Sequence, residues 1–227
     1  MKRFMELDFL GRVLLTVAFA VFFALDLLAV GHLLSETPRS NTFALDIIAR
    51  TAGLIFMCLA VALTVFRLPP KSDSLGWMPR IAAIAGTFMT LAIIVSPQAD
   101  THVAVRLAGA TLTIVGTALS IYCLMWLGRS FSIDAQARRL VTGGPYSLIR
   151  HPLYVAEAIG LAGLTLSNLS AWAVTIAVAT LLIQYWRILN EERVLSGAFP
   201  EYAAYTVAVP RIIPRQWPGS VPPAVET

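Results

Sequence analysis

The sequence predicts an all-α fold, a polytopic membrane helical bundle of five to six transmembrane helices. Of its 227 residues, 57% are apolar and only 13% are charged, and the mean hydropathy is +0.73. A soluble domain carries roughly 25% charged residues. The apolar residues gather in six segments that leave no soluble domain of useful size, so we expect an integral membrane protein.

The six apolar segments run at about 10–34, 43–66, 80–96, 103–127, 153–168 and 171–188. A span needs roughly 17–25 residues, so the first, second and fourth segments are long enough and the third is short. Only a tight turn at residues 168–170 separates the fifth segment from the sixth. We therefore expect these two to form a helical hairpin, and five spans remain if one of them is partly re-entrant.

The basic residues predict how the bundle is oriented. With six spans and a cytoplasmic N-terminus, 14 of the 17 Lys and Arg residues lie on the cytoplasmic side and three, Arg39, Arg50 and Arg106, on the other. Such a bias is typical of cytoplasmic loops. It predicts a protein of the bacterial inner membrane with both termini in the cytoplasm. The net charge of +4 then reflects topology and does not indicate nucleic-acid binding.

Three regions can be distinguished along the chain. Residues 1–127 form an N-terminal block of transmembrane helices, and residues 128–217 combine the longest polar loop with the last two helices and a polar segment after them. Long loops in compact proteins are more often functional than idle. Residues 218–227, rich in Pro and Gly, are predicted to be a disordered tail.

Cysteine and histidine usage indicates neither a disulfide framework nor a metal site. Cys58 and Cys123 both lie inside predicted spans. The three histidines, His32, His102 and His151, are too scattered for the usual ligand spacing.

Several polar residues lie inside the apolar segments. Asp46 and Arg50 are at i,i+4 spacing and are predicted to form an ion pair within their helix. Asp26 is expected to meet a neighbouring helix or a water pocket, or to have a direct chemical role. Glu157 follows Tyr154 by three residues and shares its side of the helix. The glycines at 109, 116, 160 and 163 predict close helix contacts.

The stretch Arg150–Tyr154 is the first of two charged clusters beside apolar segments. Proline suits the first turn of a helix, so Pro152 is predicted to open the fifth helix with His151 near its N-cap. Exposed N–H groups and the positive dipole end make that position attractive to a carboxylate or another anion.

The second cluster is Arg187, Glu191 and Glu192. Arg187 and Glu191 share a helix face, while Glu192 points about 100° away. One interpretation is an ion pair capping the span, with Tyr185 and Trp186 as an interfacial belt. The other joins both clusters in one pocket. It would offer cations to a carboxylate, a carboxylate to an ammonium and aromatic rings to a flat base, as a zwitterionic adenine-containing cofactor requires.

Three motifs in order resemble the isoprenylcysteine carboxyl methyltransferase family, to which membrane phospholipid methyltransferases are related. They are Leu140–Tyr154, then Arg187 with Glu191, Glu192 and Leu195, then Phe199–Pro214. The resemblance covers roughly residues 120–217. Three departures, Arg138, Ala156 and Pro200, leave the identity of the methyl acceptor open.

The resemblance implies S-adenosyl-L-methionine as cofactor, bound in a cytoplasm-facing pocket formed by the last two helices and the loop before them. A lipophilic or prenylated acceptor would enter from the bilayer among the membrane lipids. Arg187, Glu191 and Glu157 are the candidate catalytic residues, with Arg187 facing the acceptor. The candidate cofactor-binding residues are Arg139, Leu140, Val141, Gly144, Tyr146, Arg150, His151, Pro152, Leu153, Tyr154, Glu191 and Glu192.

Three functions remain open. Carboxyl O-methylation needs no base, because a carboxyl group with a reference pKa of about 4 is already ionised at neutral pH. N-methylation of a phospholipid amine or S-methylation of a small thiol requires loss of a proton, with Glu157 or His151 as candidate bases. The third is a non-catalytic membrane sensor or transport component with the same fold.

Overall fold

The computed structural model describes residues 2–35, 43–69, 85–86, 89–94, 102–131 and 137–214. Within these ranges all regular elements are helical, which confirms the all-α prediction. They are α1 (Lys2–Ser35), α2 (Phe43–Val65), α4 (Leu91–Ile94), α5 (Val103–Leu127), the 3-10 turns η1 (Gly128–Ser130) and η2 (Gly144–Ser147), α6 (Pro152–Ser167), α7 (Ala171–Ala198) and α8 (Tyr202–Ala208).

Four helices in the described part of the chain are long and apolar enough to cross a membrane: α1, α2, α5 and α7. The shorter α6 is apolar as well. Many of their large apolar side chains point outward, for example Leu28, Met125 and Leu182, as expected of helices that face lipid. Of the predicted third span, residues 80–96, the structure describes residues 85–86 and 89–94, and the last four of these form α4.

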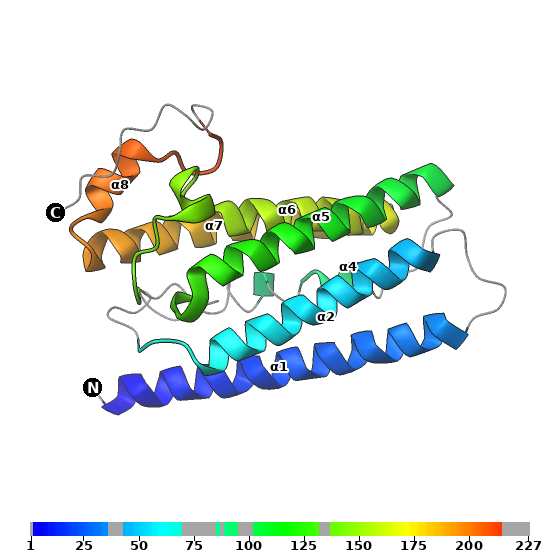
Figure 1. Ribbon diagram of the computed structural model, residues 1–227, viewed down its shortest axis with the longest axis horizontal. Helices are drawn as coiled ribbons and strands as arrows, with labels where there is room; N and C mark the ends of the chain where they lie inside the picture. Colours follow the sequence, from blue (N-terminus) through cyan, green and yellow to red (C-terminus); the bar gives the residue numbers. More distant parts are fainter. Residues whose placement is uncertain are drawn as a thin grey trace.

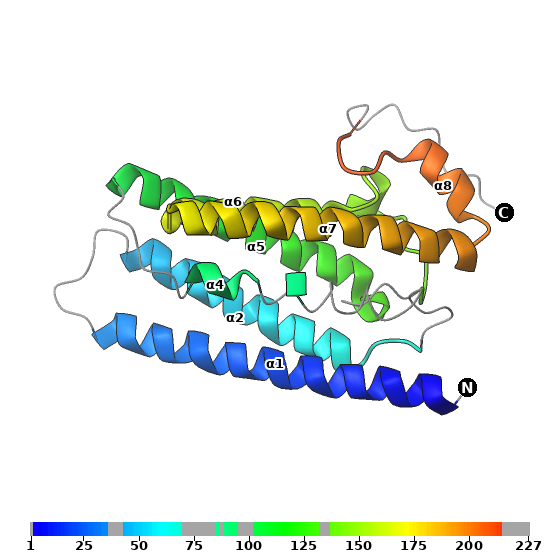
Figure 2. The same cartoon turned by 180° about the vertical axis from the view of Figure 1, so that it is seen from behind.

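The helices run back and forth along one long bundle (Figure 1). The first turn of α1, the end of α2, the end of α7 and all of α8 lie at the same end, while α5 begins at the other (Figures 1 and 2). α2 therefore ends and α5 begins at opposite ends of the bundle, and α4 lies beside α7 (Figure 2).

The predicted hairpin of the last two apolar segments is present. α6 ends at Ser167 and α7 begins at Ala171, where the Ser170 hydroxyl accepts a hydrogen bond of 3.1 Å from the Ala173 N–H and caps the helix. α7 continues to Ala198, ten residues past the apolar segment that predicted it. The extension places Glu191 and Glu192 on a helix that leaves the apolar zone.

Glycines bring α5 and α6 into backbone contact, as their positions predict. A Cβ atom at Gly116 would collide with the backbone nitrogen of Gly160, and one at Gly163 would collide with the backbone of Thr113. Small residues allow such close approach between membrane helices. These contacts hold the second half of α6 against the first half of α5.

An ion pair joins α1 to α2. The Arg50 Nη1 atom donates to Asp26 Oδ1 at 2.8 Å. Asp26 therefore meets a neighbouring helix, one of the roles expected for it. The i,i+4 spacing of Asp46 and Arg50 did not predict this partner, because it considers only one helix.

The contact between Gly116 and Gly160 predicts that alanine destabilises the protein at one of these positions and has little effect at the other. Gly116→Ala should lower the free energy of unfolding by about 1–3 kcal/mol, because the added methyl group forces two backbones apart. Gly160→Ala is the matched control, because its Cβ would lie 3.9 Å from Gly116 Cα, an ordinary contact. Thermal unfolding of the detergent-solubilised variants measures both, and equal melting temperatures would contradict the packing.

Candidate active site

The two charged clusters of the sequence meet at the end of the bundle where α7 ends and α6 begins. Two backbone hydrogen bonds align residues 150–151 with the segment after α8: the Arg150 N–H donates to Pro210 O at 2.9 Å and the His151 N–H to Arg211 O at 3.1 Å. The Tyr205 hydroxyl donates to the backbone oxygen of Tyr146 at 2.5 Å. These bonds hold residues 146–151 beside α8 and the segment that follows it.

The turn before them is fixed by Gly144. It has a φ of +59°, a left-handed conformation that L side chains rarely adopt, and a Cβ there would collide with the Trp126 ring of α5. This contact holds the η2 turn, including Tyr146, against the end of α5.

Glu192 is the centre of an ionic cluster, which we call the Glu192 clamp. Its Oε1 atom accepts bonds from Arg150 Nε at 3.0 Å and Nη2 at 2.9 Å, and it lies 3.2 Å from His151 Nε2. Its Oε2 atom accepts bonds from Arg211 Nε at 3.1 Å and Nη2 at 2.5 Å. The hydrogen bonds with Glu192 raise the pKa of Arg211.

Arg150 extends the clamp to α8. Its Nη1 atom donates to the backbone oxygens of Thr206 at 2.9 Å and Val209 at 2.6 Å. The carboxylate that the start of α6 was predicted to attract is thus supplied by the protein itself. The assignment of Arg150 and Glu192 to a cofactor stays a prediction.

A second group of side chains lies on the membrane side of the clamp. His151 is the N-cap of α6 and Pro152 its first residue, as predicted. The His151 ring meets Tyr154 edge-on, with the ring centroids 5.7 Å apart. The Arg187 guanidinium carbon lies 5.4 Å from the centroid of the Tyr154 ring, and Tyr154 interacts electrostatically with Glu191.

Glu157 belongs to the same group, as its spacing from Tyr154 predicts. Its Oε2 atom accepts a hydrogen bond of 3.0 Å from Gln184 Nε2 on α7. It also interacts electrostatically with Arg187 and Glu191. Ionisable groups within membrane segments are rare and usually functional, so we treat Tyr154, Glu157, Arg187 and Glu191 as one site, the α6–α7 site.

Two residues beside the α6–α7 site, Gln184 and Gly86, were not predicted from the sequence. Gln184 is buried, with 8% of its surface exposed, and an amide in an apolar segment three residues before Arg187 is the signal that could have revealed it. Gly86 leaves room for Arg187, because a Cβ at Gly86 would lie 3.5 Å from Arg187 Nη1. No local pattern in the sequence relates Gly86 to α7.

Two buried tyrosine hydroxyls interact electrostatically with Glu191. Tyr146 and Tyr202 are 6% and 2% exposed, and within the described ranges neither hydroxyl has a hydrogen-bond partner. Burial raises the pKa of both, and Glu191 raises each of them further. Both therefore stay protonated donors. A buried donor without a partner costs roughly 1–3 kcal/mol, so these hydroxyls fit a polar ligand beside Glu191.

The remaining predicted residues lie at the margins. Leu153 packs in a core cluster with Cys123 and Phe131, and Leu140 packs against the cluster that contains Val194 and Tyr202. Val141 is half-buried, while Arg139 is exposed. Their contact with a cofactor stays a prediction.

The clamp predicts a large loss of stability for Glu192→Ala. The substitution leaves Arg150 and Arg211 without their common anion, and removal of one partner from a buried ion pair costs roughly 3–5 kcal/mol. Glu201→Ala removes an exposed carboxylate close by and should change stability by less than about 0.5 kcal/mol. Thermal unfolding in detergent compares the two, and equal effects would contradict the clamp.

Comparisons with known proteins bear on this same region. Residues 104–202 match the family model described as phospholipid methyltransferase. The chain is 38% identical over 106 residues to the cobalt-zinc-cadmium resistance protein CzcN of Cupriavidus metallidurans, across 46% of this chain and 49% of that protein. It is 34% identical over 112 residues to the nickel-cobalt-cadmium resistance protein NccN of Alcaligenes xylosoxydans xylosoxydans, across 49% of each.

The chain thus matches about half the length of these curated relatives. The matched family segment runs from the start of α5 to the start of α8 and contains both charged clusters. It confirms the resemblance predicted from the motifs. In residues 104–202 this integral membrane protein resembles the phospholipid methyltransferase family, which supports a membrane methyltransferase.

Proposed function

We propose that this protein transfers a methyl group from S-adenosyl-L-methionine to a lipophilic or prenylated acceptor held in the bilayer. The observation that carries the proposal is the α6–α7 site, where an aromatic ring, a guanidinium and a carboxylate meet within membrane helices. The family match over residues 104–202 supports the reaction type. The six-span topology places 14 of the 17 basic residues on the same side of the membrane as the site and both termini, and this excess supports a cytoplasmic location for them.

The residues present fit the cofactor's polar groups. Glu191 would accept hydrogen bonds from its ammonium group, and the Tyr146 and Tyr202 hydroxyls offer the donors that its oxygen atoms require. Leu140 and Val141 would supply apolar contacts. The clamp would act on this site indirectly, because it holds His151, whose ring contacts Tyr154.

The bound cofactor supplies a methyl group activated on a sulfonium. Tyr154 and Arg187 would orient the acceptor so that its lone pair forms the new bond to the methyl carbon in line with the bond that breaks. Fixed orientation can account for much of the barrier reduction in such a displacement. The packing of α5 on α6 would keep water from the reacting atoms.

Carboxyl O-methylation assigns Arg187 to the acceptor's carboxylate. However, Arg187 already interacts electrostatically with Glu157, and a second carboxylate, Glu191, interacts with the same Tyr154 ring that Arg187 contacts. Two negative groups around one guanidinium disfavour a third carboxylate.

This charge balance favours a second candidate, N-methylation of a lipid amine or S-methylation of a small thiol. The acceptor's proton would pass to Glu157, whose Oε2 atom is held by Gln184. His151 is less suited as the base, because its Nε2 atom is engaged by Glu192 at 3.2 Å. The alternative of a non-catalytic membrane component predicts no cofactor binding at all.

Glu191→Gln tests the cofactor assignment. We expect the Kd for S-adenosyl-L-methionine to rise roughly ten- to hundredfold, because a hydrogen bond to a charged group contributes about 1.5–3 kcal/mol. Calorimetry on the purified protein measures this Kd, with Glu201→Gln, an exposed carboxylate, as the control. Unchanged binding in Glu191→Gln, or none in the unmodified protein, would overturn the proposal.

Glu157→Gln tests the acceptor class. With a labelled methyl donor and three acceptors (a prenylcysteine, a phospholipid amine and a small thiol), we expect amine or thiol transfer to fall about 10²–10⁴-fold. The low-pH limb of kcat/KM should disappear, since the base is gone, while cofactor binding persists. Carboxyl transfer that survives Glu157→Gln and is lost in Arg187→Met would instead establish carboxyl O-methylation.

A further inference from the structure

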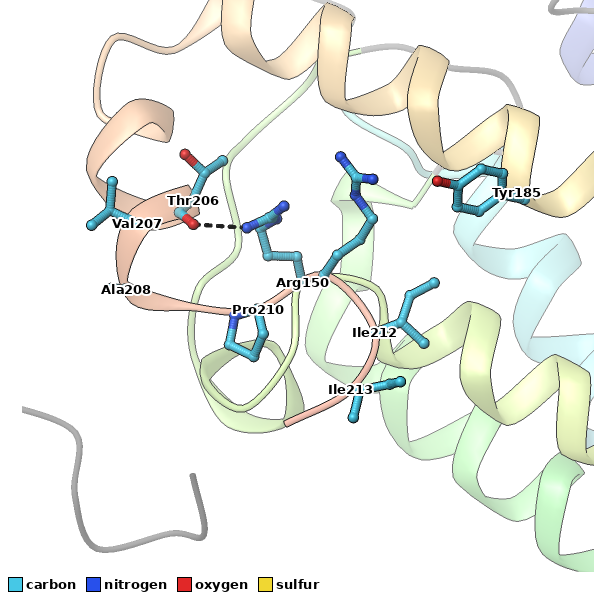
Figure 3. Close-up of a pocket in the computed structure, with 9 residues that line it drawn as sticks. Arg150, Tyr185, Thr206, Val207, Ala208, Pro210, Ile212 and Ile213 are labelled. Carbon is cyan, nitrogen blue, oxygen red and sulfur yellow. Dashed lines mark hydrogen bonds between the residues drawn. The ribbon is translucent and has the colours of Figure 1, made fainter. Parts of the chain in front are cut away.

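A pocket of about 450 Å³ lies on the outer side of the Glu192 clamp (Figure 3). Arg150, Arg211, Thr206 and Pro210 form one part of its wall, and Tyr185 of α7 forms another. None of these residues belongs to the α6–α7 site, although Arg150 and Arg211 belong to the clamp. Its volume is in the range of ordinary ligand sites, roughly 300–1,000 Å³.

The polar part of this pocket carries an excess of positive charge. Two guanidinium groups, Arg150 and Arg211, share the single carboxylate of Glu192, which leaves one positive charge when His151 is neutral. Arg150 is turned inward, and its side chain is 9% exposed, whereas that of Arg211 is 37% exposed. The excess charge is therefore presented to the pocket by Arg211, which also interacts electrostatically with Tyr185 on the pocket wall.

Apolar side chains complete the pocket wall: Val207 of α8 lies on the side opposite Tyr185, with Ile212 and Ile213 between them (Figure 3). Tyr185 precedes Glu192 by seven residues on α7, which places it about 10 Å deeper along the helix. Val207 and Ile213, which also line the pocket, are 84% and 78% exposed. Tyr185 and the neighbouring Trp186 are half-exposed, as is typical of residues at the level of lipid headgroups.

A cation at one end and exposed apolar side chains beside a membrane helix fit an anionic amphiphile. We propose that this pocket binds the phosphate group of an anionic phospholipid from the adjacent leaflet, with Arg211 as its main ligand. The guanidinium group presents paired donors that match phosphate oxygens. Val207 and Ile213 would contact the glycerol and the first carbons of the acyl chains.

The proposal concerns a lipid that is bound without being methylated, so it can be tested without a methyl donor. The full chain, purified in detergent, is titrated with short-chain phosphatidylglycerol, phosphatidylcholine or inorganic phosphate, and binding is followed by native mass spectrometry. We expect the anionic lipid to bind at least tenfold more tightly than the zwitterionic lipid. Inorganic phosphate that binds as tightly as the anionic lipid would indicate a soluble anion and overturn the lipid assignment.

Two variants assign the binding to the pocket. Arg211→Gln should weaken binding of phosphatidylglycerol at least tenfold, whereas Arg193→Gln, an exposed arginine of α7 outside the pocket, should leave it unchanged. Val207→Ser combined with Ile213→Ser keeps the clamp and should also weaken binding of the lipid. Because this pair of substitutions does not touch the clamp, it still tests the pocket if Arg211→Gln fails to fold. Equal affinity in the serine pair and in Arg193→Gln would overturn the proposal.

Discussion

The Glu192 carboxylate is the interaction on which this end of the bundle depends. It joins the start of α6, the extension of α7 and the segment after α8, which are held by Arg150, Glu192 and Arg211 respectively. Because Arg150 also bonds two carbonyl groups at the end of α8, one ionic cluster positions all three segments. Glu192 also fixes the orientation of the His151 ring, which packs against Tyr154. The geometry of the α6–α7 site thus depends on charges that lie outside it.

Two adjacent carboxylates have separate tasks because successive residues of a helix point about 100° apart. Glu192 faces residues 150–151 and 211, where its carboxylate binds the side chains of Arg150, His151 and Arg211. Glu191 interacts electrostatically with Tyr154 of α6 and with the buried Tyr146 and Tyr202. One helix turn therefore stabilises the fold on one face and provides a ligand group on the other.

Features governed by local rules could be predicted from the sequence. Pro152 at the first turn of α6, the turn before Ala171, the glycine contacts and the shared face of Tyr154 and Glu157 all depend on spacing within one segment. Partners on different helices were not predictable in this way. Arg50 with Asp26 and Gln184 with Glu157 depend on the rotation of one helix against another. Such rotations are set by side-chain packing, which a single sequence does not display.

The unequal lengths of α6 and α7 explain where the site lies along α7. The 16 residues of α6 span about 24 Å at 1.5 Å per residue, less than the roughly 30 Å of a hydrocarbon core. α7 has 28 residues and reaches about 42 Å, so it extends past the start of its partner. His151 consequently meets Glu192, whereas Tyr154, in the first turn of α6, meets Arg187 about one turn earlier on α7. Under the proposed function, a lipophilic acceptor would bring its polar end to Arg187 and Glu157 while its chain remained in lipid.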